Sequence, residues 1–79
     1  MDSPSFETIL RTAEIVLSST RSRLAGGTLQ LTPEIGSAME ALERALAAAR
    51  SEPVVSRRRV LIAVTAALEL NRLVRRTDH

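Results

Sequence analysis

With 79 residues, the chain has room for one domain, and its lack of cysteine excludes disulfides and thiolate metal sites. Phe6 is the only aromatic residue, which excludes an aromatic platform for stacking nucleic-acid bases. The net charge is only +2, yet residues 1–40 carry just three of the eleven Arg and five of the nine acids, so the second half is basic. A domain this small has a thin stability margin, and oligomerisation is the expected substitute for disulfides or metals.

Two features of the composition bear on where the protein works. Every basic residue except the histidine is Arg, a usage that fits a GC-rich bacterial genome. Residues 1–5 lack the basic and apolar pattern of a secretory signal, and no apolar run approaches the roughly 18 residues that cross a bilayer. We therefore expect a bacterial, cytoplasmic protein without a membrane partner.

The first predicted helix covers residues 4–25. Ser3 precedes Pro4, and a hydroxyl cap followed by proline in the first turn is a typical helix start. Glu7 and Arg11 are four residues apart, a spacing that favours an ion pair on one helix. Apolar residues recur at three- and four-residue steps and form one face: Phe6, Ile9, Leu10, Ala13, Val16, Leu17 and Leu24.

The second predicted helix covers residues 33–51. Glycines at 26–27 separate it from the first helix, because glycine tolerates the left-handed conformation that follows many helices. Residues 28–31 alternate between polar and apolar, which allows a brief extended segment. Thr32 and Pro33 then repeat the pattern of a hydroxyl cap and a proline in the first turn. Its apolar stripe comprises Ile35, Ala38, Met39, Leu42, Ala45, Leu46 and Ala49.

The third predicted helix covers residues 55–76. Glu52 ends the preceding pattern, because the residue before Pro53 is pushed away from the helical conformation. Residues 60–68 contain no charge, so apolar side chains would surround most of this part of the helix, and Ile62 even interrupts its polar stripe. We expect this helix to be central and to present an apolar interface made by Val60, Leu61, Val64, Leu68 and Val74.

Together these segments predict an all-α fold, a small three-helix antiparallel bundle that homodimerisation completes. The excess apolar surface of the third helix is the basis for expecting a dimer or a larger assembly. Asn71 leaves two alternatives open on that helix. A buried Asn could fix the register of a helical dimer by pairing with its symmetry mate, whereas an exposed Asn is the commoner case.

Arg57, Arg58 and Arg59 carry the strongest functional signal in the sequence. If Ser56 caps the third helix, the arginines occupy its first turn, where positive charge opposes the helix dipole and favours an anionic partner such as a phosphate or an acidic surface. If the helix begins earlier, the arginines lie one turn in and are solvated or paired with Glu52.

The sequence shows no constellation for catalysis, cofactor binding or metal ligation. The carboxylates fall mainly on polar faces near arginines, which is typical of solvated ion pairs. His79, the single histidine, is the final residue, and no base accompanies the capping hydroxyls. We therefore predict that the chain is not an enzyme and holds no cofactor or metal.

The function that these features favour is a non-enzymatic protein–protein interaction module, such as a small bacterial adaptor, regulator or chaperone-like protein. It would act through the apolar face of the third helix, with a second copy or another protein as partner. The alternative is a basic helical dimer that grips nucleic-acid backbone through Arg57, Arg58 and Arg59. Direct reading of bases is disfavoured, because a recognition helix exposes polar residues and the third helix is mostly apolar.

Overall fold

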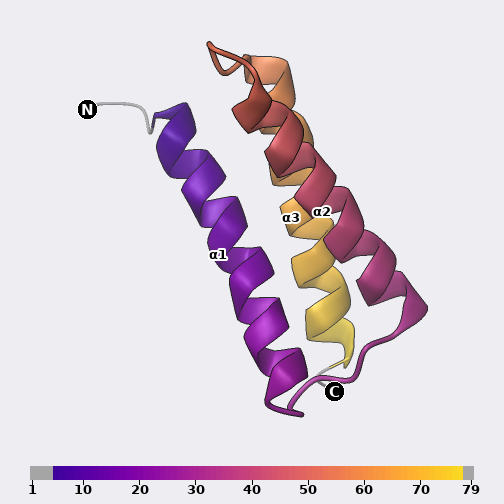
Figure 1. The fold of residues 1–79 in the computed structure, drawn as a ribbon. Helices are drawn as coiled ribbons and strands as arrows, with labels where there is room; N and C mark the ends of the chain where they lie inside the picture. Colours follow the sequence, from indigo (N-terminus) through magenta and orange to yellow (C-terminus); the bar gives the residue numbers. More distant parts are fainter. Residues whose placement is uncertain (1–4, 78–79) are drawn as a thin grey trace.

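A computed structural model describes residues 5–77 as three helices joined by short connections (Figure 1). The helices are α1 (Phe6–Ala25), α2 (Pro33–Ser51) and α3 (Arg57–Thr77). Consecutive helices run in opposite directions, so α1 and α3 are parallel to each other (Figure 1). The prediction of an all-α three-helix bundle is confirmed.

The start of α1 lies two residues beyond the predicted position. Ser5 is the capping residue, and its Oγ accepts a hydrogen bond from the backbone N–H of Thr8 at 3.2 Å. The predicted cap, Ser3, and the proline after it lie outside the described residues. Serine caps a helix by accepting a bond from one of the first, otherwise unpaired, N–H groups, and Ser5 supplies that acceptor.

The connection from α1 to α2 is a turn with a buried anchor. Gly27 has φ = 78°, the left-handed region that glycine adopts without steric cost, and the chain reverses there. Residues 28–31 form no strand, although their alternation allows one; instead Leu29 is buried beneath the ends of the helices. Thr32 then caps α2 by accepting a bond from the N–H of Ile35 at 3.1 Å, and α2 has the bounds that the sequence predicts.

One hydrophobic core lies between the three helices, and α3 packs against both of the others. Alanines from α2 and α3 take part in it, including the fully buried Ala49 and Ala63, because small side chains let helices approach closely. The contact between α1 and α2 is the least extensive of the three. The buried apolar residues are Leu10, Ala13, Leu17, Leu29, Ile35, Ala38, Leu42, Ala45, Leu46, Ala49, Val60, Ala63, Ala67, Leu70 and Val74.

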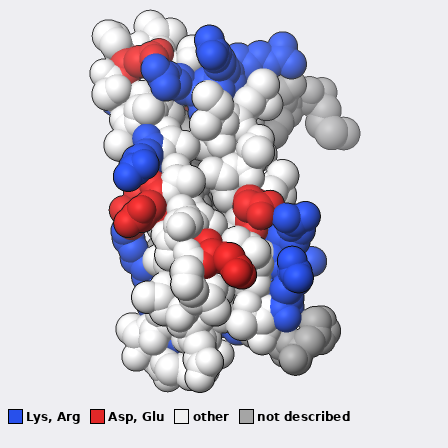
Figure 2. Space-filling view, turned by 90° about the vertical axis from the view of Figure 1, so that its right-hand side faces the viewer, with Lys and Arg blue, Asp and Glu red and all other residues white. Residues whose placement is uncertain are grey.

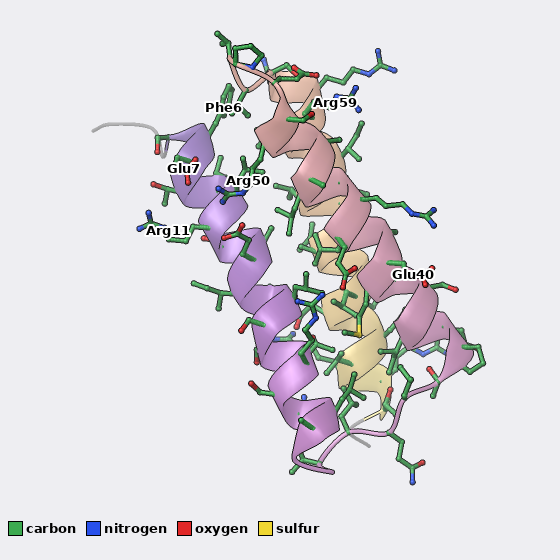
Figure 3. All side chains as sticks on the ribbon, viewed as in Figure 1. Phe6, Glu7, Arg11, Glu40, Arg50 and Arg59 are labelled. Carbon is green, nitrogen blue, oxygen red and sulfur yellow. The ribbon has the colours of Figure 1, made fainter. Side chains whose placement is uncertain are left out.

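Charged side chains lie on the surface, where acidic and basic groups stand beside one another (Figure 2). Arg50 reaches from α2 to α1 and pairs with Glu14 at 2.9 Å and Glu7 at 3.5 Å (Figure 3). The structure therefore pairs Glu7 with the neighbouring helix, whereas Arg11, its expected partner, points away from the bundle (Figure 3). A second ion pair, between Arg21 and Glu43, joins the same two helices. Exposed pairs of this kind each contribute about 0–1 kcal/mol, so they add orientation more than stability.

Candidate interaction surface

The arginine cluster stands at the very start of α3. Ser56 caps this helix: its Oγ accepts a bond from the N–H of Arg59 at 3.3 Å, and its carbonyl accepts one from Val60 at 3.1 Å. Arg57 is the first helical residue, two positions later than the predicted start. The three arginines therefore occupy the first turn, the arrangement in which their charge opposes the helix dipole.

The three arginines differ in their partners. Arg59 is paired within the chain, because its Nε lies 3.0 Å from Oε1 of Glu52. Arg57 and Arg58 are exposed, and no acidic side chain within residues 5–77 pairs with either. The start of α3 at Arg57 contradicts the alternative in which the helix begins earlier, although the pairing with Glu52 that this alternative offered is present at Arg59.

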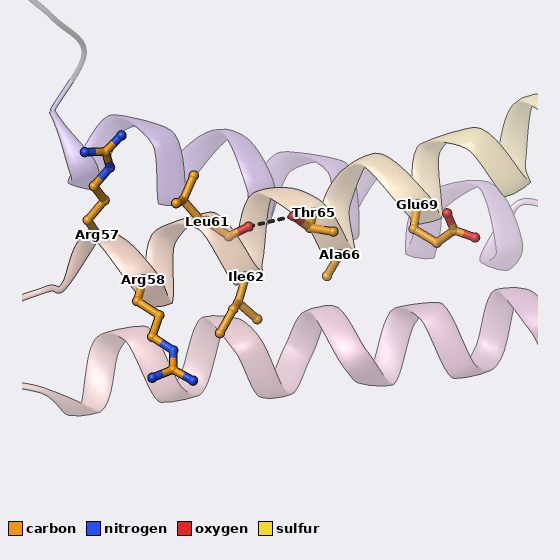
Figure 4. A pocket seen from close by; sticks show the side chains of 7 residues that line it. All are labelled: Arg57, Arg58, Leu61, Ile62, Thr65, Ala66 and Glu69. Carbon is orange, nitrogen blue, oxygen red and sulfur yellow. Dashed lines mark hydrogen bonds between the residues drawn. The ribbon is translucent and has the colours of Figure 1, made fainter.

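C-terminal to the arginines, α3 exposes a row of apolar side chains, Leu61 and Ile62, to solvent. Leu61 is 54% exposed and Ile62 is 46% exposed, although both are large aliphatic side chains. An open surface depression runs along this row (Figure 4). Figure 4 shows the arginines at one end and a carboxylate at the other; the lining residues are Arg57, Arg58, Leu61, Ile62, Thr65, Ala66 and Glu69.

The five residues predicted for the interface are divided between core and surface. Val60 and Val74 are buried in the core of the chain itself, so within this bundle they face the other helices rather than a partner. Val64 is half-buried against that core. Leu61 and Leu68 remain on the surface, and Leu68 is 64% exposed.

Sequence reasoning missed Ile62 as a candidate contact residue. It interrupts a polar stripe that includes Arg58 and Glu69, and the structure places it on the open face between those two charges (Figure 4). The sequence pattern that could have identified it is a large aliphatic residue inside an otherwise polar stripe. Such a position has no core to enter, so it marks apolar surface that a monomer leaves uncovered.

A second apolar hollow lies between α1 and α3, on the flank of the same helix. It measures about 450 Å³ and meets α3 at Val64, Ala67, Leu68 and Asn71. From α1 it is lined by Thr8, Ile9, Thr12, Ala13 and Val16. Asn71 is exposed at its rim, which is the commoner of the two environments considered for this residue.

Within residues 5–77 the acidic side chains of α3 and of the segment before it pair with arginines on the surface. Glu52 and Glu69 each lie 3.0 Å from an arginine nitrogen on the surface. No group of three or more histidine, cysteine, aspartate or glutamate side chains in the described part of the chain is placed to hold a metal ion. None of the three helices described is long and apolar enough to span a membrane.

No family model, curated protein or solved structure matches the chain. The function of this surface must therefore be argued from its own residues. These are two arginines that no acid of residues 5–77 pairs with, the exposed aliphatic side chains and a carboxylate, all on α3.

Proposed function

We propose that the chain is a non-enzymatic protein–protein interaction module, a small adaptor, regulator or chaperone-like protein that acts through the outer face of α3. The supporting observation is the exposure of Leu61, Ile62 and Leu68 within eight residues of one helix. Scattered exposed aliphatic residues are normal on a protein surface, whereas a contiguous set marks a site that another protein covers. The partner in this proposal is either a second copy, giving a homodimer, or another protein.

The charges around the apolar row fit the same function. Protein interfaces combine an apolar centre with a polar rim, and arginine is enriched in them. Here Arg57 and Arg58 border the row on one side and Glu69 borders it on the other. The rim would orient a partner, while Leu61 and Ile62 would supply the area removed from water.

A photo-crosslinking residue in place of Leu61 should give discrete protein adducts in the cells that naturally produce the chain. The reason is that this side chain stands exposed within the proposed surface. The matched control carries the same residue at Ala47, which is exposed on α2 and does not line the depression. An adduct of two copies has twice the mass of the 8.6 kDa chain, and an adduct with another protein has a different mass. Equal labelling from both positions, or no discrete adduct at position 61, contradicts the proposed function.

Binding to nucleic-acid backbone is the second candidate function, and the cap at Ser56 favours it. Because α3 begins at Arg57, the side chains of Arg57 and Arg58 lie beside the free N–H groups of the first turn. Both would be available for phosphates, since neither is paired with an acid within residues 5–77. This contact would be independent of base sequence.

Salt and arginine removal together test the second candidate. If it holds, the affinity for a short DNA duplex falls linearly with the logarithm of salt concentration, and the Arg57→Ala, Arg58→Ala double variant lowers the slope by about two. Fluorescence anisotropy of a labelled duplex measures both effects. Arg44→Ala removes an exposed arginine from α2 and serves as the control. An affinity unchanged in the double variant, or equally reduced in the control, rules this function out.

A further inference from the structure

We infer that the partner of the outer α3 face is a second copy of this chain, docked antiparallel so that Arg58 of each copy meets Glu69 of the other. This inference rests on the proposed function and specifies its partner. It follows from the order of side chains along the depression. Arginine comes first, then large aliphatic residues, then small residues, and finally glutamate.

The charges at the two ends of the depression are complementary. Arg58 and Glu69 mark the two ends of the lining, eleven residues apart, or about 16 Å along the helix axis. That distance prevents them from pairing within one chain, where Glu69 instead forms an exposed pair with Arg72 at 3.0 Å; in the dimer Arg58 of the second copy would join that pair. Two copies related by a two-fold axis near the middle of the row would place Arg58 of each copy opposite Glu69 of the other, which gives two identical contacts.

The sizes of the side chains between those two ends are complementary as well. The same two-fold axis, which falls between residues 63 and 64, brings Leu61 toward Thr65 of the second copy and Ile62 toward Ala66, since Leu61 and Ile62 lie on opposite edges of the face (Figure 4). Each large aliphatic side chain therefore meets a small one, as close packing of two helices requires. The same two-fold rotation thus pairs opposite charges and places large side chains against small ones.

Other alignments of the two helices lose this match. A parallel pair sets Arg58 beside Arg58 and Glu69 beside Glu69, which repel. Sliding the antiparallel pair by about one turn in one direction brings Arg58 opposite Arg72, another exposed arginine. The charges therefore specify both the direction and the register of the dimer.

The antiparallel pair also accounts for the unfavourable position of Arg58. A positive charge in the first turn of a helix is opposed by the dipole, and within residues 5–77 no acid of the same chain compensates it. Arg59 already has such compensation from Glu52. In the dimer, Glu69 of the second copy would supply it to Arg58.

Charge reversal with sedimentation equilibrium tests this arrangement, at concentrations from about 1 µM to about 300 µM. The unaltered chain should form a reversible dimer. Arg58→Glu and Glu69→Arg should each weaken the dimer by about tenfold to a hundredfold, because each variant places like charges at two symmetric contacts. The double variant should regain the affinity of the unaltered chain to within about threefold. Arg44→Glu makes the same charge change on α2 and should leave the dimer unaffected.

Mixing the two single variants provides a second readout. One variant carries Glu at both contact positions and the other carries Arg at both, so the mixture should form a heterodimer although each variant alone is mainly monomeric. Far-UV circular dichroism checks that all variants fold, as expected for exposed positions. A parallel dimer is distinguished by the single variants, which would not weaken it, since like charges already face each other there.

Several results overturn the inference: an unaltered chain that stays monomeric, single variants that dimerise normally, or a double variant that does not recover. If the unaltered chain is monomeric while the crosslinker at Leu61 captures a different protein, the antiparallel dimer is wrong and the proposed function stands. If that crosslinker captures nothing, the proposed function fails as well.

Discussion

Replacing Leu42 with alanine should lower the free energy of unfolding by about 3 kcal/mol, because the change removes a fully buried side chain and leaves a cavity. Leu42 lies in the middle of α2, within the core that the three helices share. A loss of this size is a large part of the total stability of a small domain. Urea denaturation followed by far-UV circular dichroism measures it, and partial unfolding without denaturant is the extreme form of the expected result.

The matched control for this variant is Leu31→Ala. Leu31 undergoes the same chemical change but is exposed in the segment before α2, so its loss should cost no more than about 0.5 kcal/mol. Equal destabilisation by the two substitutions would show that Leu42 does not occupy the core described above.

Enlarging Ala49 to leucine should destabilise the fold by about 1–3 kcal/mol, because it overfills the core, whereas Leu42→Ala leaves a cavity in it. Ala49 is fully buried in the core, so the added atoms must displace neighbouring side chains or push the helices apart. The midpoint of thermal unfolding should fall by several degrees or more, since about 1 kcal/mol corresponds to roughly 4–8 °C in a domain of this size.

Ala47→Leu is the control for Ala49→Leu, because Ala47 is two residues away on α2 and exposed. Alanine and leucine both favour helices, so the exposed substitution should change the thermal midpoint little. If Ala47→Leu destabilised the chain more than Ala49→Leu, the face of α2 that packs against the core would be assigned wrongly.

The helices were predictable from the sequence because their ends depend on local chemistry. Thr32 and Pro33 define the start of α2, and the glycine pair at 26–27 defines the end of α1, without help from distant residues. At the start of α1 the predicted cap was Ser3 and the observed cap is Ser5, because local rules leave an error of one or two residues at helix ends.

The division of the apolar arc of α3 was not predictable in the same way. Periodicity shows how wide an apolar arc is, but the two neighbouring helices decide which part of it they cover. In the structure the core takes Val60, Ala63, Ala67, Leu70 and Val74 from α3, whereas Leu61 and Leu68 stay outside, so side-chain size does not decide the division. A prediction that assigns bulky residues to one interface therefore mixes core and surface.

For the same reason, ion pairs between helices cannot be predicted from the spacing of residues along the sequence. The four-residue rule identifies Arg11 as a partner for Glu7, but it contains no information about the neighbouring helix. Arg50 comes from α2, forty-three positions later, and takes that role because antiparallel packing brings the end of α2 beside the start of α1.

The weak attachment of α1 makes the stability of this molecule uneven along the chain. Leu10 and Leu17 are the large aliphatic side chains that α1 buries, and exposed ion pairs also join it to α2. Salt screens such exposed pairs and each adds little stability, so α1 is held mainly by its packing against α3. Partial opening of the bundle would therefore begin with the release of α1, and would uncover the flank of α3 that lines the second hollow, where Val64 and Ala67 lie.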